Sequence, residues 1–170
     1  MGCSAAQPGA TSLIPGAVFA GSLDGHLRAY DTATGKKLVE SEPFEYQYAT
    51  RFSTKGHGFY LVTENEKGMV DLSVWDGKSL ISVKTGKSIH PAFNLDGTVL
   101  AYAVSQDRVS QTAYLYDLQE KTEVEITSGK SLSFSFIEKP QRLLVRDNVA
   151  NEVIVYSTDF KGENVIELFD

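Results

Sequence analysis

The chain has 170 residues, of which 42% are hydrophobic and 11% aromatic, so it contains enough apolar material to bury a core. The net charge of −6 predicts that nucleic acid is not a partner, because binding to phosphates needs clustered basic residues and Lys36-Lys37 is the only adjacent pair. No apolar stretch approaches the roughly 20 residues of a membrane span, so none is predicted.

The N-terminal segment contains the single cysteine, Cys3, which excludes an internal disulfide. Met1-Gly2-Cys3-Ser4 is similar to the start of a myristoylation signal or to the end of a lipoprotein processing site. However, Ala6 stands where myristoylation requires Ser or Thr, and no apolar signal region precedes Cys3. Cys3 is therefore a candidate for lipidation, with an incidental thiol in a disordered tail as the alternative.

Short apolar runs separated by turn residues predict strands along the whole chain, and no segment has a helical period. Up to Glu40 we expect strands at residues 17–22, 26–30 and 37–40, whereas no strand is evident in residues 3–15, which are rich in Ala, Ser, Gly and Pro. The next strands are expected at residues 49–53, 59–63, 69–75 and 79–83, then at 89–93, 98–104, 112–117 and 121–127. The last four are expected at residues 132–137, 142–146, 153–156 and 164–169.

A short motif recurs among these strands. An aromatic residue precedes a small polar or acidic one in Tyr30-Asp31, Trp75-Asp76, Tyr116-Asp117 and Tyr156-Ser157, with gaps of 45, 41 and 40 residues between the aromatics. A period of this size is typical of β-propellers, in which each repeat is one four-stranded blade. We therefore predict an all-β fold, a β-propeller of about four blades of four antiparallel strands. It forms one domain with blades at about residues 3–43, 44–86, 87–129 and 130–170. The aromatics recur in phase, which favours packing between blades.

The missing first strand leaves three ways in which the ring could close. In one, the N-terminal tail supplies that strand and completes a ring of four blades. In another, the chain is a piece of a larger propeller. In the third, a homodimer closes a ring of eight blades, which would cover the sheet edges that an open array exposes.

No set of residues predicts catalysis. A Gly-x-Ser-x-Gly elbow is absent, and His26, His57 and His90 fall in different blades, so we predict no catalytic residue, no cofactor and no metal. Phe44, Tyr46 and Tyr48 gather in the link between the first two blades, and loops on a rigid scaffold often carry recognition. We predict that these three aromatics bind a partner. The function is then that of a non-catalytic scaffold or binding module for a protein, which the acidic balance predicts to be basic or neutral.

The first blade has a specific pattern: a hydrophobic strand, the turn Gly21-Ser22-Leu23-Asp24-Gly25, a second strand, and Tyr30-Asp31-Thr32-Ala33-Thr34-Gly35-Lys36. Over residues 3–38 this pattern resembles a repeat of pyrroloquinoline quinone enzymes of the polyvinyl-alcohol dehydrogenase type, although Val39 stands where that family usually has Trp. The later blades are similar to TolB-type or WD-type repeats, most clearly over residues 92–102. A divergent propeller, a truncated gene product and an engineered chimera of blades all agree with this mixture.

The resemblance implies an alternative function, a fragment or half-ring of a quinoprotein alcohol dehydrogenase. Such enzymes have eight blades, hold pyrroloquinoline quinone and calcium over the central axis, and are periplasmic. The resemblance therefore implies that compartment, and without it the localisation stays open. It assigns no catalytic or cofactor-binding residue here, because the family's calcium ligands and catalytic Asp lie on other blades and the haem motif Cys-x-x-Cys-His is absent.

Overall fold

The computed structural model describes residues 11–22, 24–41, 46–53, 55, 58–149 and 152–169, without the side chains of residues 46–50, 52 and 169. Every regular element in these ranges is a β-strand, and each strand pairs antiparallel with its neighbour in sequence. The described part contains no helix long and apolar enough to cross a membrane.

The strands form four sheets of four. The first sheet contains β1 (Ser12–Ile14), β2 (Ala17–Gly21), β3 (Leu27–Asp31) and β4 (Lys37–Glu40). The second contains β5 (Tyr46–Phe52), β6 (Phe59–Glu64), β7 (Val70–Trp75) and β8 (Leu80–Gly86). The third contains β9 (Ser88–Phe93), β10 (Val99–Ser105), β11 (Gln111–Asp117) and β12 (Thr122–Gly129). The fourth contains β13 (Leu132–Glu138), β14 (Gln141–Val149), β15 (Glu152–Thr158) and β16 (Ile166–Phe169).

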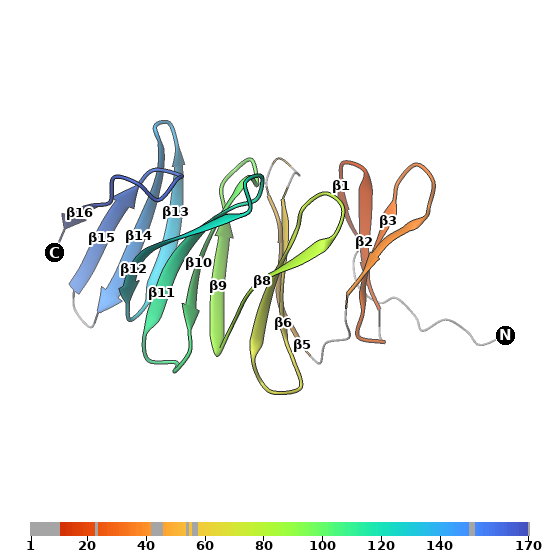
Figure 1. Cartoon of the computed structure of the whole chain (residues 1–170), viewed down its shortest axis with the longest axis horizontal. Coiled ribbons are helices and arrows are strands. Elements are labelled where there is room, and N and C mark those ends of the chain that lie inside the picture. Colours follow the sequence, from red (N-terminus) through yellow and green to blue (C-terminus); the bar gives the residue numbers. More distant parts are fainter. Residues whose placement is uncertain are drawn as a thin grey trace.

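The four sheets stand side by side in chain order, like consecutive blades of a propeller (Figure 1). The first and fourth sheets lie at opposite ends of this row, so the array is open. The predicted all-β propeller architecture with four four-stranded blades is confirmed. The four described sheets do not close into a ring of four blades.

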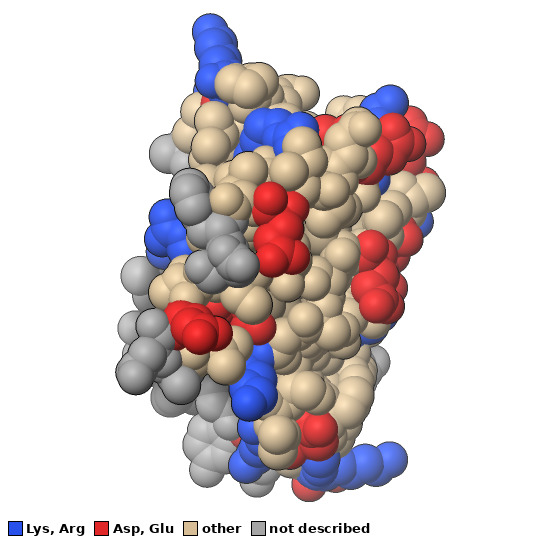
Figure 2. Space-filling model, turned by 90° about the vertical axis from the view of Figure 1, so that its left-hand side faces the viewer, with Lys and Arg blue, Asp and Glu red and all other residues tan. Residues whose placement is uncertain are grey.

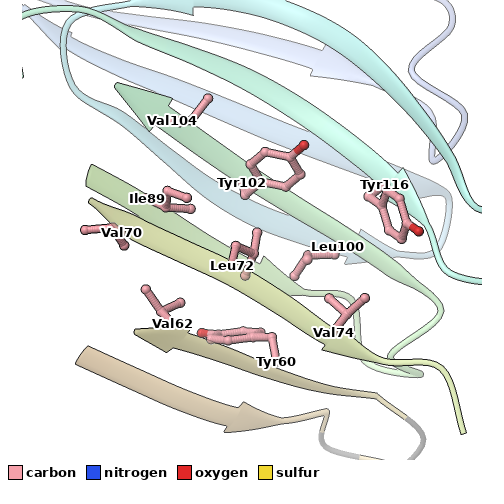
Figure 3. Packing of buried hydrophobic residues seen from close by; sticks show 10 residues of the cluster. All are labelled: Tyr60, Val62, Val70, Leu72, Val74, Ile89, Leu100, Tyr102, Val104 and Tyr116. Carbon is pink, nitrogen blue, oxygen red and sulfur yellow. The ribbon is translucent and has the colours of Figure 1, made fainter. Parts of the chain in front are cut away.

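Three apolar clusters join neighbouring sheets. Between the second and third sheets, Leu72 and Leu100 are fully buried, and their side chains point toward one another across the contact (Figure 3). Along β6, Phe59 and Leu61 face the first sheet, whereas Tyr60 and Val62 face the third. This strand is apolar at successive positions because both of its faces are covered, as the unbroken run in the sequence predicts.

A polar contact accompanies the cluster between the second and third sheets. The hydroxyl of the fully buried Tyr102 donates a hydrogen bond to Glu123, which also accepts one from Lys84 Nζ at 2.6 Å. The Lys84 ammonium lies 4.0 Å from the centre of the Tyr114 ring. Lys84 belongs to the second sheet and its partners to the third, so the charges fasten the outer strands of adjacent sheets.

The repeated aspartates close the turns between the third and fourth strands of each sheet. Asp31, Asp76 and Asp117 each accept two backbone N–H groups, from the residues two and three positions further along. In the fourth sheet this role belongs to Asp159, which accepts the N–H groups of Lys161 and Glu163. The residue that follows Tyr156, Ser157, does not take this role, because the Asp that closes the turn stands three residues after Tyr156. Asx turns of this kind satisfy the backbone locally, which explains why Asp recurs.

Most strands differ from the prediction by a few residues at their ends, and two differences concern the first strands of the first two sheets. The strand absent from the sequence analysis is β1, only three residues long, which pairs Ile14 with Ala17 across a turn at Gly16. The strand expected at residues 49–53 begins at Tyr46, because β5 continues past a bulge between Gln47 and Ala49.

Candidate binding site

A cleft of about 470 Å³ opens between the first two sheets. Its lining combines three carboxylates, a carboxamide, hydroxyls and an apolar surface, namely Val39, Glu40, Ser41, Leu61, Thr63, Glu64, Asn65, Asp71, Ser73, Leu80 and Ser82. The first three come from β4 and the residue that follows it, and the rest from the second sheet. No Lys or Arg lines the cleft, so its lining has a negative charge.

Asp71 is held in place by neighbours on both of its oxygens. Asn65 Nδ2 donates to Asp71 Oδ2 at 2.9 Å, and Thr85 Oγ1 donates to Asp71 Oδ1 at 2.5 Å. The Asn65 side-chain oxygen in turn accepts the N–H groups of Lys67 and Met69, which shapes the turn between β6 and β7. Asp71 therefore has a fixed orientation in the lining of the cleft.

Glu40 lies in an ionic network on the first sheet. Lys37 pairs with Glu40 Oε2, and Arg28 Nη2 lies 3.1 Å from Glu40 Oε1 and 2.7 Å from Asp24 Oδ2. These hydrogen bonds, first from Lys37 and then from Arg28, lower the pKa of Glu40 below its usual value. Glu40 is therefore ionised at neutral pH, but its charge is largely compensated by the two cations.

Ser41 fixes the edge of the cleft where the first sheet ends. Its Oγ accepts the N–H of Leu27 at 2.9 Å, and its N–H donates to the carbonyl of Leu27 at 2.9 Å. His26 Nδ1 lies 2.7 Å from the Ser41 carbonyl oxygen. The turn between β2 and β3 therefore supports this side of the cleft.

The structure locates only part of the predicted partner-binding set. Phe44 lies outside the described residues, as do Cys3 and His57. Tyr46 and Tyr48 belong to strand β5 and not to a linking loop. Tyr46 pairs with Glu64, which lines the cleft, and Tyr48 is the extra residue of the bulge. The main chain thus brings Tyr46 next to the cleft.

The residues of the cleft do not fit a calcium and quinone site. No group of three or more His, Cys, Asp or Glu side chains that could hold a metal occurs among the residues that the structure describes. The Asp71 oxygens already accept hydrogen bonds from Asn65 and Thr85, and Glu40 is paired with Arg28 and Lys37. A calcium ion needs six to eight oxygen ligands, which this donor set does not offer.

Sequence reasoning missed the cleft itself. Glu40, Glu64 and Asp71 stand on three strands of two sheets and share no sequence motif. The one signal that pointed to this region was the aromatic cluster at residues 44–48, which immediately follows the first sheet.

Two curated relatives match part of the chain. A polyvinylalcohol dehydrogenase from Sphingopyxis sp. (strain 113P3) is 68% identical over 56 residues, and one from Pseudomonas sp is 46% identical over 48 residues. These segments make up 33% and 28% of this chain but only 9% and 8% of the two enzymes. No protein-family model matches the chain. The resemblance to polyvinyl-alcohol dehydrogenases is confirmed over about a third of the chain.

Solved structures share the fold along almost the whole chain. The β-propeller domain of the Trilobed protease from Pyrococcus furiosus has a TM-score of 0.56 at 15% identity, covering 91% of this chain and 53% of its own. An oligogalacturonate lyase in complex with manganese has a TM-score of 0.57 at 11% identity, covering 93% and 52%. TolB from Acinetobacter baumannii has a TM-score of 0.51 at 14% identity, covering 94% and 43%. The chain spans about half the length of these proteins and shares the β-propeller fold with them.

Proposed function

We propose that the protein is a non-catalytic β-propeller binding module, and that its cleft between the first two sheets receives a protein segment carrying a basic side chain. The observation that supports this proposal is the lining of the cleft, which contains three carboxylates and no basic residue. Leu61 and Leu80 offer apolar surface to the aliphatic stem of a Lys or Arg, and Glu64 offers its charge to the head. Electrostatic attraction of this kind raises the rate of encounter and selects against acidic partners.

A labelled Arg-containing peptide tests the proposal, with fluorescence anisotropy as the measurement. We expect Glu64→Gln to weaken binding about threefold to tenfold, because one charge pair is lost while the shape is kept. Tyr46→Ala is expected to weaken it as well, since its main chain adjoins the cleft. Glu152→Gln, an exposed change on β15, serves as the matched control for net charge. Equal affinity of the Glu64→Gln and Glu152→Gln variants for the peptide would refute the assignment of the cleft.

The similarity to polyvinylalcohol dehydrogenases favours a second candidate function, part of a quinoprotein dehydrogenase. In this case the cofactor site would need ligands beyond the described residues. The test is to add pyrroloquinoline quinone and Ca²⁺ and to measure quinone binding and dye-linked oxidation of polyvinyl alcohol. Binding of the quinone with turnover supports the enzyme, and no binding in the presence of Ca²⁺ eliminates it for this chain.

A further inference from the structure

The three contacts between sheets share one packing rule. In each sheet after the first, the aromatic residue of the repeat faces the preceding sheet. Trp75 belongs to the cluster with the first sheet, Tyr116 to the cluster with the second, and Tyr156 packs on the cluster between the third and fourth. The side chain at this position therefore packs on the preceding sheet in each of the three contacts.

Tyr30 holds the same position in the first sheet, where the structure describes no preceding sheet. It pairs with Val18 of β2, and the neighbouring Ala17 and Phe19 face the second sheet. Because side chains alternate along a strand, Val18 and Tyr30 lie on the opposite face, called the free face because no other described sheet covers it. Both are only partly buried, and Leu13, which pairs with Val18, is 71% exposed.

The fourth sheet offers the complementary free face. Leu143 and Val145 pack on the third sheet, so Leu144 between them points away from it. Ile137 pairs with Arg142 and shares this free face, and its side chain is 38% exposed. Figure 2 views the molecule from this end and shows uncharged residues over much of the surface. Ile137 and Leu144 lie on the side of the fourth sheet that faces away from the preceding sheet, just as Ile14 and Phe19 lie on the side of the first sheet that packs on Trp75.

We propose that two copies of this chain pair through these faces, with Tyr30 of one copy packed on Ile137 and Leu144 of the other. The contact repeats the rule of the interior contacts and forms twice in a two-fold dimer, which joins the two rows of four sheets into one ring. Exposed apolar side chains on both faces are covered in this way. The dimer contact does not involve the cleft between the first two sheets, so the test of the dimer is independent of the test of peptide binding.

The two faces carry opposite charges near the loop between the second and third strands of each sheet. Arg146 lies on the free face of the fourth sheet, near the loop between its second and third strands, and forms no salt bridge with any described residue. Asp24 lies in the corresponding loop of the first sheet, where it is paired with Arg28 and its side chain is 39% exposed. The pairing brings Arg146 toward Asp24. Two of the three described ion pairs between the second and third sheets have the same direction, since Lys55 and Lys84 of the second sheet bind Asp96 and Glu123 of the third, whereas Lys121 of the third sheet binds Asp76 of the second.

Two experiments on the purified chain test the proposal. Light scattering coupled to size-exclusion chromatography should give twice the 18.6 kDa of the chain. Tyr30→Ala and Leu144→Arg should raise the dimer dissociation constant about tenfold or more, the effect of losing one anchor side chain. Val109→Arg, at a 70% exposed position in the loop between β10 and β11, should leave the mass unchanged. Far-ultraviolet circular dichroism checks that each variant is folded.

Cysteine cross-linking then identifies the paired faces. In a Cys3→Ser background, a mixture of the Tyr30→Cys and Leu144→Cys variants should form a disulfide-linked dimer, whereas neither variant should do so alone. A mass of 18.6 kDa at all concentrations overturns the proposal. Cross-linking of Tyr30→Cys with itself also overturns it, because it indicates a like-with-like contact.

Discussion

Replacement of Phe19 by Ala tests whether each contact between sheets is an independent source of stability. Phe19 is only 2% exposed, stacks on Phe59 at 4.5 Å between ring centres, and meets Trp75 edge-on at 5.3 Å. Deleting a buried Phe side chain costs about 3–5 kcal/mol of unfolding free energy, a large share of the roughly 5–15 kcal/mol that holds a domain folded. The loss falls on the contact between the first two sheets.

Trp75 is the only tryptophan, so its fluorescence reports on this contact during urea unfolding. For a loss of about 4 kcal/mol and a slope of about 2 kcal/mol/M, the Phe19→Ala variant should shift the fluorescence midpoint down by about 2 M. The matched control is Leu143→Ala, a fully buried residue in the contact between the last two sheets. In repeat arrays each unit interacts only with its neighbours, so this control should lower the circular-dichroism transition and spare the fluorescence transition.

Two results would refute this reasoning. If Phe19→Ala leaves the fluorescence midpoint unchanged, the aromatic contact does not carry the stability assigned to it. If Phe19→Ala and Leu143→Ala shift both signals equally, the four sheets unfold as one cooperative unit and the nearest-neighbour picture is wrong.

Two further predictions concern the turns. Gly97→Ala should lower the free energy of unfolding by about 1–3 kcal/mol, because φ at Gly97 is +71° and an added Cβ would lie 2.5 Å from the Gly58 nitrogen of the neighbouring sheet. Calorimetry measures the loss, and Gly21→Ala is the control because an added Cβ there meets open space. Hydrogen bonds from the N–H groups of Ser110 and Val109 lower the pKa of Asp107 to about 2. Since this pKa lies below the roughly 3.9 of an unfolded Asp, the stabilisation is present above about pH 4 and is lost as the pH falls through 2. Asp107→Asn should flatten the acid limb of a stability–pH profile, and an unchanged limb would contradict this explanation.

The strands could be predicted because burial on two faces leaves a direct record in the sequence. β10 is buried at all seven positions, and its residues form an almost continuous apolar run. The period was visible because an Asp closes the turn after the third strand of each sheet. In the fourth sheet this Asp stands two residues beyond Ser157, because β15 extends to Thr158. β1 escaped prediction because a strand of three residues directly before Pro15 carries no periodic signal.

The candidate site could not be predicted in the same way. The cleft lies between the end of the first sheet and three strands of the second, so it depends on how the two sheets stand beside one another and not on any one segment. Asp71 is fixed by Asn65 and by Thr85, six and fourteen residues away, and Glu40 by Arg28, twelve residues away. Such partners become neighbours only after the hairpins have paired, so their separations along the chain follow no recognisable sequence motif.

The pairing of each strand with its neighbour in sequence has a consequence for synthesis on the ribosome. A sheet of about 42 residues emerges in roughly 2–8 s at 5–20 residues per second, whereas a hairpin forms in about 1–10 μs. Each sheet can therefore complete its hydrogen bonds long before the next one exists. During those seconds Phe19 and the rest of the apolar face of the first sheet stay exposed to solvent, because the second sheet has not yet been synthesised. Chaperones therefore have most access to the nascent chain between the completion of one sheet and the synthesis of the next.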